Sequence, residues 1–137
     1  MIETSPNQSQ EEWGIQGGTI DRSRFDHVGL VTADRKEGES FVEQTRVWVT
    51  NPRVSAFNVE WLRFEPDSPV TGLLRDQPHV AYRVDDLARA LEGHTVLAEP
   101  FDPTGRGDDF LRVAFVEVDG AVVEFMQYGN PDEQGWF

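Results

Sequence analysis

Several short stretches of the chain alternate apolar and polar residues, which is the pattern of a β-strand with one buried face. Residues 79–84 show this pattern most clearly, with Val80 and Tyr82 on one face and His79 and Arg83 on the other. The alternation predicts a strand here. It also places a histidine near the start of this strand, on the face opposite the apolar row.

Turn and capping residues divide the rest of the chain into further elements. Asp85 or Asp86 is an N-cap for a helix over about 86–92, which Gly93 ends. The pair Asp119-Gly120 predicts a tight hairpin. Further strands are expected at 25–31, within 41–50, and at 57–64, 95–99, 111–118 and 121–128, with a short helix over 39–45 as the alternative for part of the second.

Two segments occur twice in similar form. FDHVGLV near the start resembles PHVAYRV after residue 77, and NVEWLRFE resembles VVEFMQYG near the end. Each half of the chain therefore contributes a histidine from its first strand and a glutamate from its last strand. If a pseudo-twofold axis relates the two halves, these side chains converge on one place. They are His27, Glu60, His79 and Glu124.

Two imidazoles and two carboxylates are a suitable ligand set for a divalent transition metal, with positions left for water or substrate. Taken one at a time, such residues are more simply packed histidines or solvent-facing glutamates. However, apolar residues flank both glutamates, in the letters VEW and VEF. The period of two then puts the neighbours on the buried face and each glutamate on the other face. This matched arrangement in both halves favours a shared metal site.

Composition limits the classes of protein and of partner. A chain of 137 residues, 38% of them hydrophobic, suffices for one domain over 25–128, made of two modules at about 25–70 and 78–128. Residues 1–24 are then an N-terminal arm and 129–137 a C-terminal tail. The net charge of −13 argues against a nucleic-acid partner. Without cysteines, a long apolar run or a secretion signal, we expect a cytoplasmic protein with no membrane partner.

The segments FDHVGL, VEWLRFEPDSPV, PHVAYRVDDLARAL and VVEFMQY resemble the vicinal oxygen chelate superfamily, which includes glyoxalase I, methylmalonyl-CoA epimerase, extradiol dioxygenases and bleomycin-resistance proteins. The resemblance is strongest to epimerase-like members. It implies an α+β, glyoxalase-like fold in which two βαβββ modules form a cupped mixed β-sheet. The same four residues, His27, Glu60, His79 and Glu124, are the implied ligands. The first module is short for this family, so its helix and one strand are expected to be shortened or missing.

The resemblance also implies a metal-dependent isomerase or lyase that acts on a small oxygen-chelating substrate through an enolate-type intermediate. In this interpretation Glu124 is the first choice for the catalytic base and Glu60 the second, with purely structural ligation as the alternative for both. The cofactor is a divalent metal ion, nickel, cobalt, manganese, zinc or iron rather than calcium, because imidazole favours transition metals. Since relatives often dimerise, a homodimer is expected.

Strand parity adds candidate substrate-binding residues on the ligand face: Arg83, Met126 and Tyr128. For Arg83, pairing with one of the many acidic residues is the simpler alternative. Two other functions stay open. An Fe(II) dioxygenase would use two histidines and one glutamate, leaving Glu60 as an extra ligand. A non-enzymatic protein would instead bind and sequester a small molecule in the cup.

Overall fold

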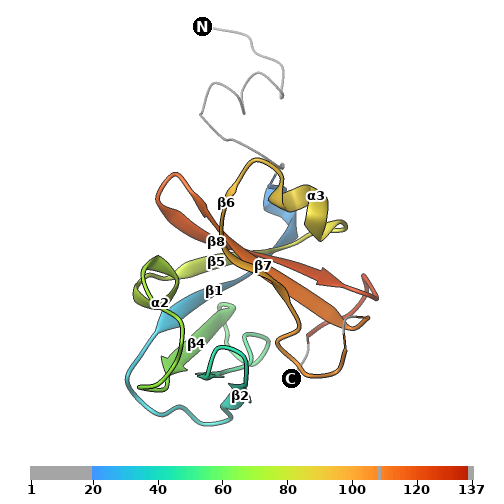
Figure 1. Ribbon diagram of the computed structural model, residues 1–137. Coiled ribbons are helices and arrows are strands. Elements are labelled where there is room, and N and C mark those ends of the chain that lie inside the picture. Colours follow the sequence, from blue (N-terminus) through green and yellow to red (C-terminus); the bar gives the residue numbers. More distant parts are fainter. Residues whose placement is uncertain (1–19, 108, 136–137) are drawn as a thin grey trace, which may run out of the picture.

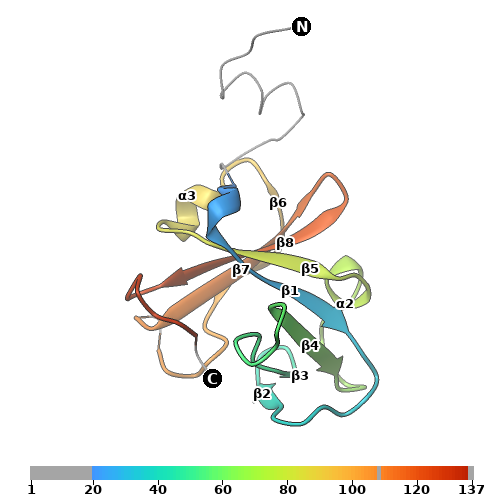
Figure 2. The same ribbon diagram turned by 180° about the vertical axis from the view of Figure 1, so that it is seen from behind.

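A computed structural model describes residues 20–107 and 109–135, and these form one curled, mixed β-sheet (Figures 1 and 2). The strand order in this eight-stranded sheet is β2-β3-β4-β1-β5-β8-β7-β6. Most of the expected N-terminal arm, residues 1–19, and the end of the C-terminal tail lie outside the described residues. The elements are the 3₁₀ helix η1 (Arg22–Arg24), β1 (Phe25–Val31), β2 (Ser40–Val42), β3 (Val47–Val49), β4 (Val59–Phe64), α2 (Leu73–Asp76), β5 (His79–Arg83), α3 (Leu87–Leu91), β6 (Thr95–Phe101), β7 (Leu111–Val118) and β8 (Ala121–Tyr128).

The strand pairing contains an internal twofold symmetry. β1 and β5, the first strands of the two halves, lie antiparallel at the middle of the sheet, with Val28 opposite Val80. On the outer side of each, the last strand of the same half pairs in parallel. Gly29 lies opposite Glu60 in the first half, and Ala81 lies opposite Glu124 in the second. The predicted pair of repeated modules in a cupped mixed sheet is therefore confirmed.

The sheet has two faces with separate apolar cores. On the outer face, Leu87 and Ala90 of α3 cover Val123 and Phe125. Asp86 caps this helix by accepting a hydrogen bond from the backbone N–H of Arg89, as the sequence indicated. The inner face carries two clusters, one around Met126 and one formed by the following four residues of the first module: Val42, Val47, Val49 and Leu62.

The first module keeps all its strands and lacks its helix. Within the described residues, 32–39 connect β1 to β2 as turns and bends, so the helix expected to be shortened or missing is missing, while the strands are present in shortened form. Residues 41–50 form the β2–β3 hairpin rather than a single extended run or a helix at 39–45. Arg46 at its turn has a φ of 49°. β2 and β3 have only three residues each.

The helices are short. α3 has five residues and α2 four. α2, which the sequence analysis did not predict, lies in the connection between the two modules. No helix in the part of the chain described here is long and apolar enough to cross a membrane.

Candidate metal centre

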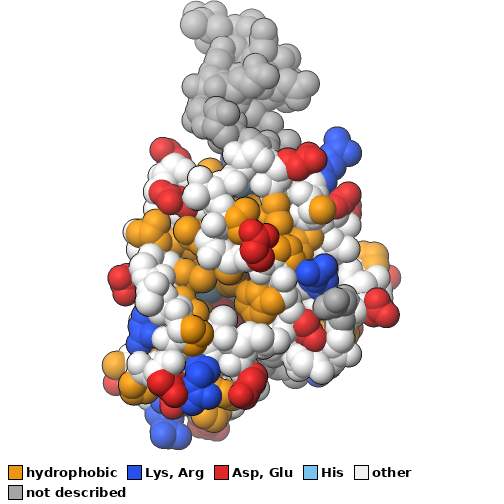
Figure 3. Space-filling view, viewed as in Figure 1, with side chains coloured by type: hydrophobic (Ala, Val, Ile, Leu, Met, Phe, Trp, Pro, Cys, Tyr) orange, Lys and Arg blue, Asp and Glu red, His pale blue; other side chains and the backbone are white. Residues whose placement is uncertain are grey.

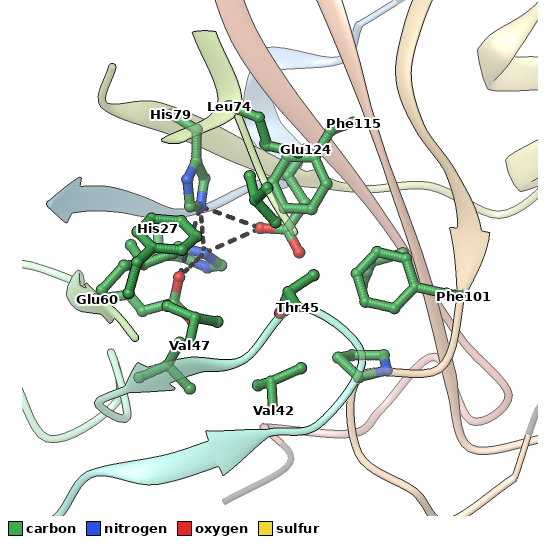
Figure 4. Close-up of a pocket in the computed structure, with 16 residues that line it drawn as sticks. His27, Val42, Thr45, Val47, Glu60, Leu74, His79, Phe101, Phe115 and Glu124 are labelled. Carbon is green, nitrogen blue, oxygen red and sulfur yellow. Dashed lines mark hydrogen bonds and ion pairs between the residues drawn. The ribbon is translucent and has the colours of Figure 1, made fainter. Parts of the chain in front are cut away.

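Strand pairing brings the four predicted ligands together on the inner face of the sheet (Figure 4). All four side chains are buried, and one donor atom from each lies within 4.8 Å of the others. His27 and His79 come from the central strands β1 and β5, while Glu60 and Glu124 come from the strands that flank them. Each half of the chain thus supplies one histidine and one glutamate, as the repeats predicted.

The distances between donor atoms suit a bound ion. Oε1 of Glu124 lies 3.3 Å from Nε2 of His27 and 3.2 Å from Nε2 of His79. Oε1 of Glu60 lies 3.5 Å from both of these nitrogens, which are themselves 3.4 Å apart. An ion about 2.1 Å from each donor separates neighbouring donors by about 3.0 Å in an octahedron and about 3.4 Å in a tetrahedron. The cluster therefore fits a divalent transition metal without a large rearrangement.

A carboxylate behind His27 fixes which ring nitrogen faces the cluster. Oδ2 of Asp26 lies 2.7 Å from Nδ1 of His27. An ionised carboxylate only accepts hydrogen bonds, so Nδ1 carries a proton and Nε2 is left to bind the metal. Asp26 reaches this position because the β1–β5 register shifts between Phe25 and His27. Such a bulge changes the direction of a side chain, so that Asp26 points towards the face of the cluster instead of the opposite face that regular alternation predicts.

Two arginines hold Asp26 in place. Arg53 donates to Oδ2 at 3.0 Å and to the Asp26 carbonyl, and Nε of Arg83 donates to Oδ1 at 3.1 Å. Burial raises the pKa of Asp26, but the hydrogen bond with His27 and the charges of His27 and Arg53 outweigh it, so this pKa lies below the usual range. Asp26 is therefore a fixed negative charge next to the cluster.

A glycine makes room for the ring of His79. A Cβ atom at Gly29 would lie 2.0 Å from Cε1 of this imidazole, so any larger residue would displace it. On its other side the ring meets Phe115 edge-on, with centroids 5.3 Å apart. Backbone and aromatic contacts therefore fix the orientation of His79.

In the absence of a metal, the contacts within the cluster shift the pKa values of His27, His79 and Glu60. Burial lowers the pKa of His27, but Glu60 and the hydrogen bond with Asp26 outweigh this and raise it well above 6.5. The pKa of His79 is also raised, because the hydrogen bonds with Glu124 and Glu60 outweigh its burial. For Glu60, the two histidines overcome the effect of burial and lower the pKa to about 2. A metal ion would take the place of the protons that the raised pKa values keep on the imidazoles.

The ligands line an apolar cavity. Its walls come from both modules, and Figure 3 shows hydrophobic side chains around a hollow on this face. Among the described residues, Thr45 is the one polar lining residue outside the ligand set. The free volume is about 60 Å³, which is space for a few water molecules. The remaining lining residues are Val42, Val47, Val49, Leu62, Phe64, Val70, Leu74, Phe101, Pro103, Val113 and Phe115.

The residues predicted to bind substrate do not line this cavity. Arg83 pairs with Asp26, donates to the carbonyls of Glu133 and Gln134, and lies 4.5 Å from the Tyr128 ring centroid. Tyr128 and Met126 are buried in the inner core. Burial and the Asp26 charge raise the pKa of Tyr128 above its usual value. The acidic pairing considered for Arg83 is thus present, and its role in substrate binding stays a prediction.

Several residues near the site were not expected from the sequence. Asp26 was missed because alternation places its side chain on the other face of the strand from His27, and no local sequence pattern predicts the bulge. Three lining residues were also missed. Thr45 lies in a turn, Leu74 lies in a helix that was not predicted, and Phe101 lies in the part of β6 beyond the predicted strand end at residue 99. Adjacent Asp and His residues in a predicted strand are the one signal that could have indicated Asp26.

Comparisons with known proteins support the fold. No family model and no curated protein matches the sequence. Among solved structures, the chain is similar to a hypothetical protein from Bacillus halodurans, with a TM-score of 0.58 and 18% sequence identity. The match covers 80% of this chain and 96% of that one. At this identity, the similarity shows the fold alone.

Proposed function

We propose that this protein is a metal-dependent isomerase or lyase related to the vicinal oxygen chelate superfamily. It binds one divalent ion through His27, Glu60, His79 and Glu124 and acts on a small substrate with two neighbouring oxygens. The observation that carries the proposal is the ligand cluster itself. Four buried donor atoms lie at distances that suit metal coordination, and Asp26 orients one of the histidines.

The bound ion would supply Lewis-acid stabilisation of negative charge on the substrate oxygens. The chain itself supplies the proton acceptor. Glu124 is the first candidate, because one of its oxygens faces the imidazoles while the other lies on the cavity side (Figure 4). It can take a proton from the carbon next to the chelating oxygens and leave an enolate-type intermediate. Glu60 is the second candidate. The apolar walls offer few hydrogen-bond partners to water near the reacting atoms.

Metal analysis and hydrogen exchange test the proposal. Protein purified without chelators is expected to contain close to one equivalent of nickel, cobalt, manganese, zinc or iron. With the correct small hydroxyketone or related compound, it should exchange the carbon-bound proton for deuterium in D₂O, as followed by NMR. Glu124→Gln is expected to retain the metal and to lower the rate of this proton exchange by about 100-fold or more. Glu60→Gln is the matched control, since it also removes one carboxylate from the cluster.

Two results would favour another function. If two or more of the four ligand substitutions leave metal affinity unchanged, the metal site lies elsewhere. Iron in the native protein together with oxygen uptake on catechols would indicate an Fe(II) dioxygenase. The apolar cavity also suits a small-molecule binding protein, and a metal-free protein that binds apolar compounds would support that function. The cytoplasmic location and the homodimer stay predictions.

A further inference from the structure

Outside the ligand cluster, the described residues that line the cavity are all uncharged. No lysine or arginine is among the lining residues in the described part of the chain. From this we infer that the substrate is a small, uncharged and largely apolar compound with two neighbouring oxygens, and that it carries no carboxylate, phosphate or coenzyme A group. This inference rests on the proposed function and specifies its substrate class.

Four arginines are sequence neighbours of lining residues, and all four are engaged elsewhere. Arg63, between Leu62 and Phe64, pairs with Glu39 at 2.7 Å. Arg112, next to Val113, donates to the carbonyl of Pro100. Arg75, next to Leu74 on α2, donates to the carbonyls of Val70 and Glu65 and lies 5.2 Å from the ring centroid of Phe64. Arg46, next to the lining residue Thr45, pairs with Asp67 at 2.7 Å. A substrate anion in the cavity would therefore meet no guanidinium ready to pair with it.

The charges at the centre also disfavour an anion. Two glutamate carboxylates balance the charge of one divalent ion, so the loaded cluster is formally neutral. The chain as a whole carries a net charge of −13. An anionic tail would thus lose its hydration against an apolar wall without gaining a partner, and such burial is costly.

The size of the cavity places the substrate tail against this wall. A free volume of about 60 Å³ accepts the chelating atoms and little more. The rest of the molecule then lies against half-buried apolar side chains such as Leu74 and Phe101, which line the cavity from α2 and β6 (Figure 4). These side chains, rather than the metal ligands, decide which tail is accepted.

A pair of chelators that differ only in charge tests this inference. Full-length protein is stripped of metal and reloaded with Co²⁺, whose visible absorption reports ligand binding. Allomaltol is a neutral hydroxypyranone, and comenate is the same ring with a carboxylate in place of the methyl group. After correction for the affinity of each chelator for free Co²⁺, allomaltol is expected to bind about tenfold more tightly or better.

A variant with a new charge tests the role of the wall. Leu74→Arg is expected to reduce this preference by about tenfold, because it supplies a partner for the carboxylate. Leu74→Gln adds a polar side chain of similar length without charge and is expected to leave the preference unchanged.

The outcomes separate the two proposals. Equal or tighter binding of comenate by the Co²⁺-loaded wild-type protein would overturn the substrate class and leave the metal site intact. An unchanged preference in a Co²⁺-loaded Leu74→Arg variant would do the same. Failure of the wild-type protein to bind Co²⁺ would overturn the proposed function, and the substrate class with it.

Discussion

Asp26 connects the candidate metal centre to the rest of the protein. It accepts a hydrogen bond from His27 on one side and is held by Arg53 and Arg83 on the other. Arg83 also donates to the carbonyl groups of Glu133 and Gln134. The orientation of His27 therefore depends on a partly buried ionic network that extends to the C-terminal segment.

Asp26→Asn is expected to weaken metal affinity by about 10- to 100-fold, because the neutral amide supports the ligating tautomer of His27 less well and leaves two arginines without their charge partner. Isothermal titration with Zn²⁺ or Ni²⁺ measures this. The exposed Asp34 provides the control, since Asp34→Asn removes the same charge far from the cluster. Equal affinity of the wild type and Asp26→Asn would show that the contact with His27 does not tune the site.

Gly29→Ala is expected to lower metal affinity by about tenfold or more, because the new methyl group would occupy the space of the His79 ring. Ala81 is the matched position in the second module, opposite His27 in the register. Ala81→Gly adds no atom, and it is expected to preserve metal affinity while lowering stability by roughly 1 kcal/mol. Metal titration and thermal unfolding of both variants separate the two effects.

At the level of the elements, the two modules differ in how their outer face is covered. In the second module α3 packs over Phe125, which is fully buried. Trp61 occupies the equivalent position in the first module, where the helix is missing, and it is only half-buried. The ammonium group of Lys36 lies 4.4 Å from its ring centroid. A loop side chain thus partly replaces the absent helix.

Phe125→Ala is expected to lower the free energy of unfolding by about 3–5 kcal/mol, since it leaves a cavity under α3. Trp61→Ala is expected to cost less than half as much, because its ring already contacts water. Both residues lie on the face opposite the ligands, so metal affinity should change little in either variant. Urea denaturation and metal titration measure the two quantities. A larger loss of stability for Trp61→Ala would show that this face is covered in solution.

The strands and ligands could be predicted from the sequence because their signals are local. Alternation located β1 from Phe25 to Val31 without error, and Asp119-Gly120, with φ values of 51° and 84°, forms the predicted turn. The four ligands followed because the chain repeats its own pattern. The features that the sequence analysis did not predict depend on tertiary structure. A bulge at Asp26 and a four-residue helix at the cavity wall have no periodicity of their own, so they could not be read from the residues.

For the molecule as a whole, metal binding and protonation are linked. In the metal-free protein the pKa values of His27 and His79 are raised. The folded state therefore keeps protons on these imidazoles above pH 6.5, where the unfolded chain has lost them. This contribution to stability is complete below about pH 6.5 and is lost as the pH rises through the folded-state pKa values. Glu60, whose pKa falls from 4.5 to about 2, also stabilises the fold, but its contribution has the opposite pH dependence: it is complete above about pH 4.5 and is lost as the pH falls towards 2.

The metal-free protein is therefore expected to lose thermal stability as the pH rises above about 6.5. Saturation with metal should remove this loss, because the ion replaces the protons. Metal affinity should rise with pH over the same range, by up to about tenfold per unit for each proton displaced. Calorimetry across this pH range, with and without Zn²⁺, measures both. A loss of stability that persists unchanged in the loaded protein would contradict this linkage.

The twofold relation at the Val28–Val80 pair has an evolutionary consequence. One module alone carries half a ligand set, so the simplest ancestor with the same centre is a half-length chain that paired with an identical copy. After duplication and fusion, each functional position existed twice and the copies were free to diverge. Two differences between the modules would then result from that divergence. Gly29 in the first module corresponds to Ala81 in the second, and among the described elements the outer face of the first module has no helix where α3 covers the second. The ligand pairs match between the two modules, while the glycine or alanine beside each histidine and the cover of each outer face differ.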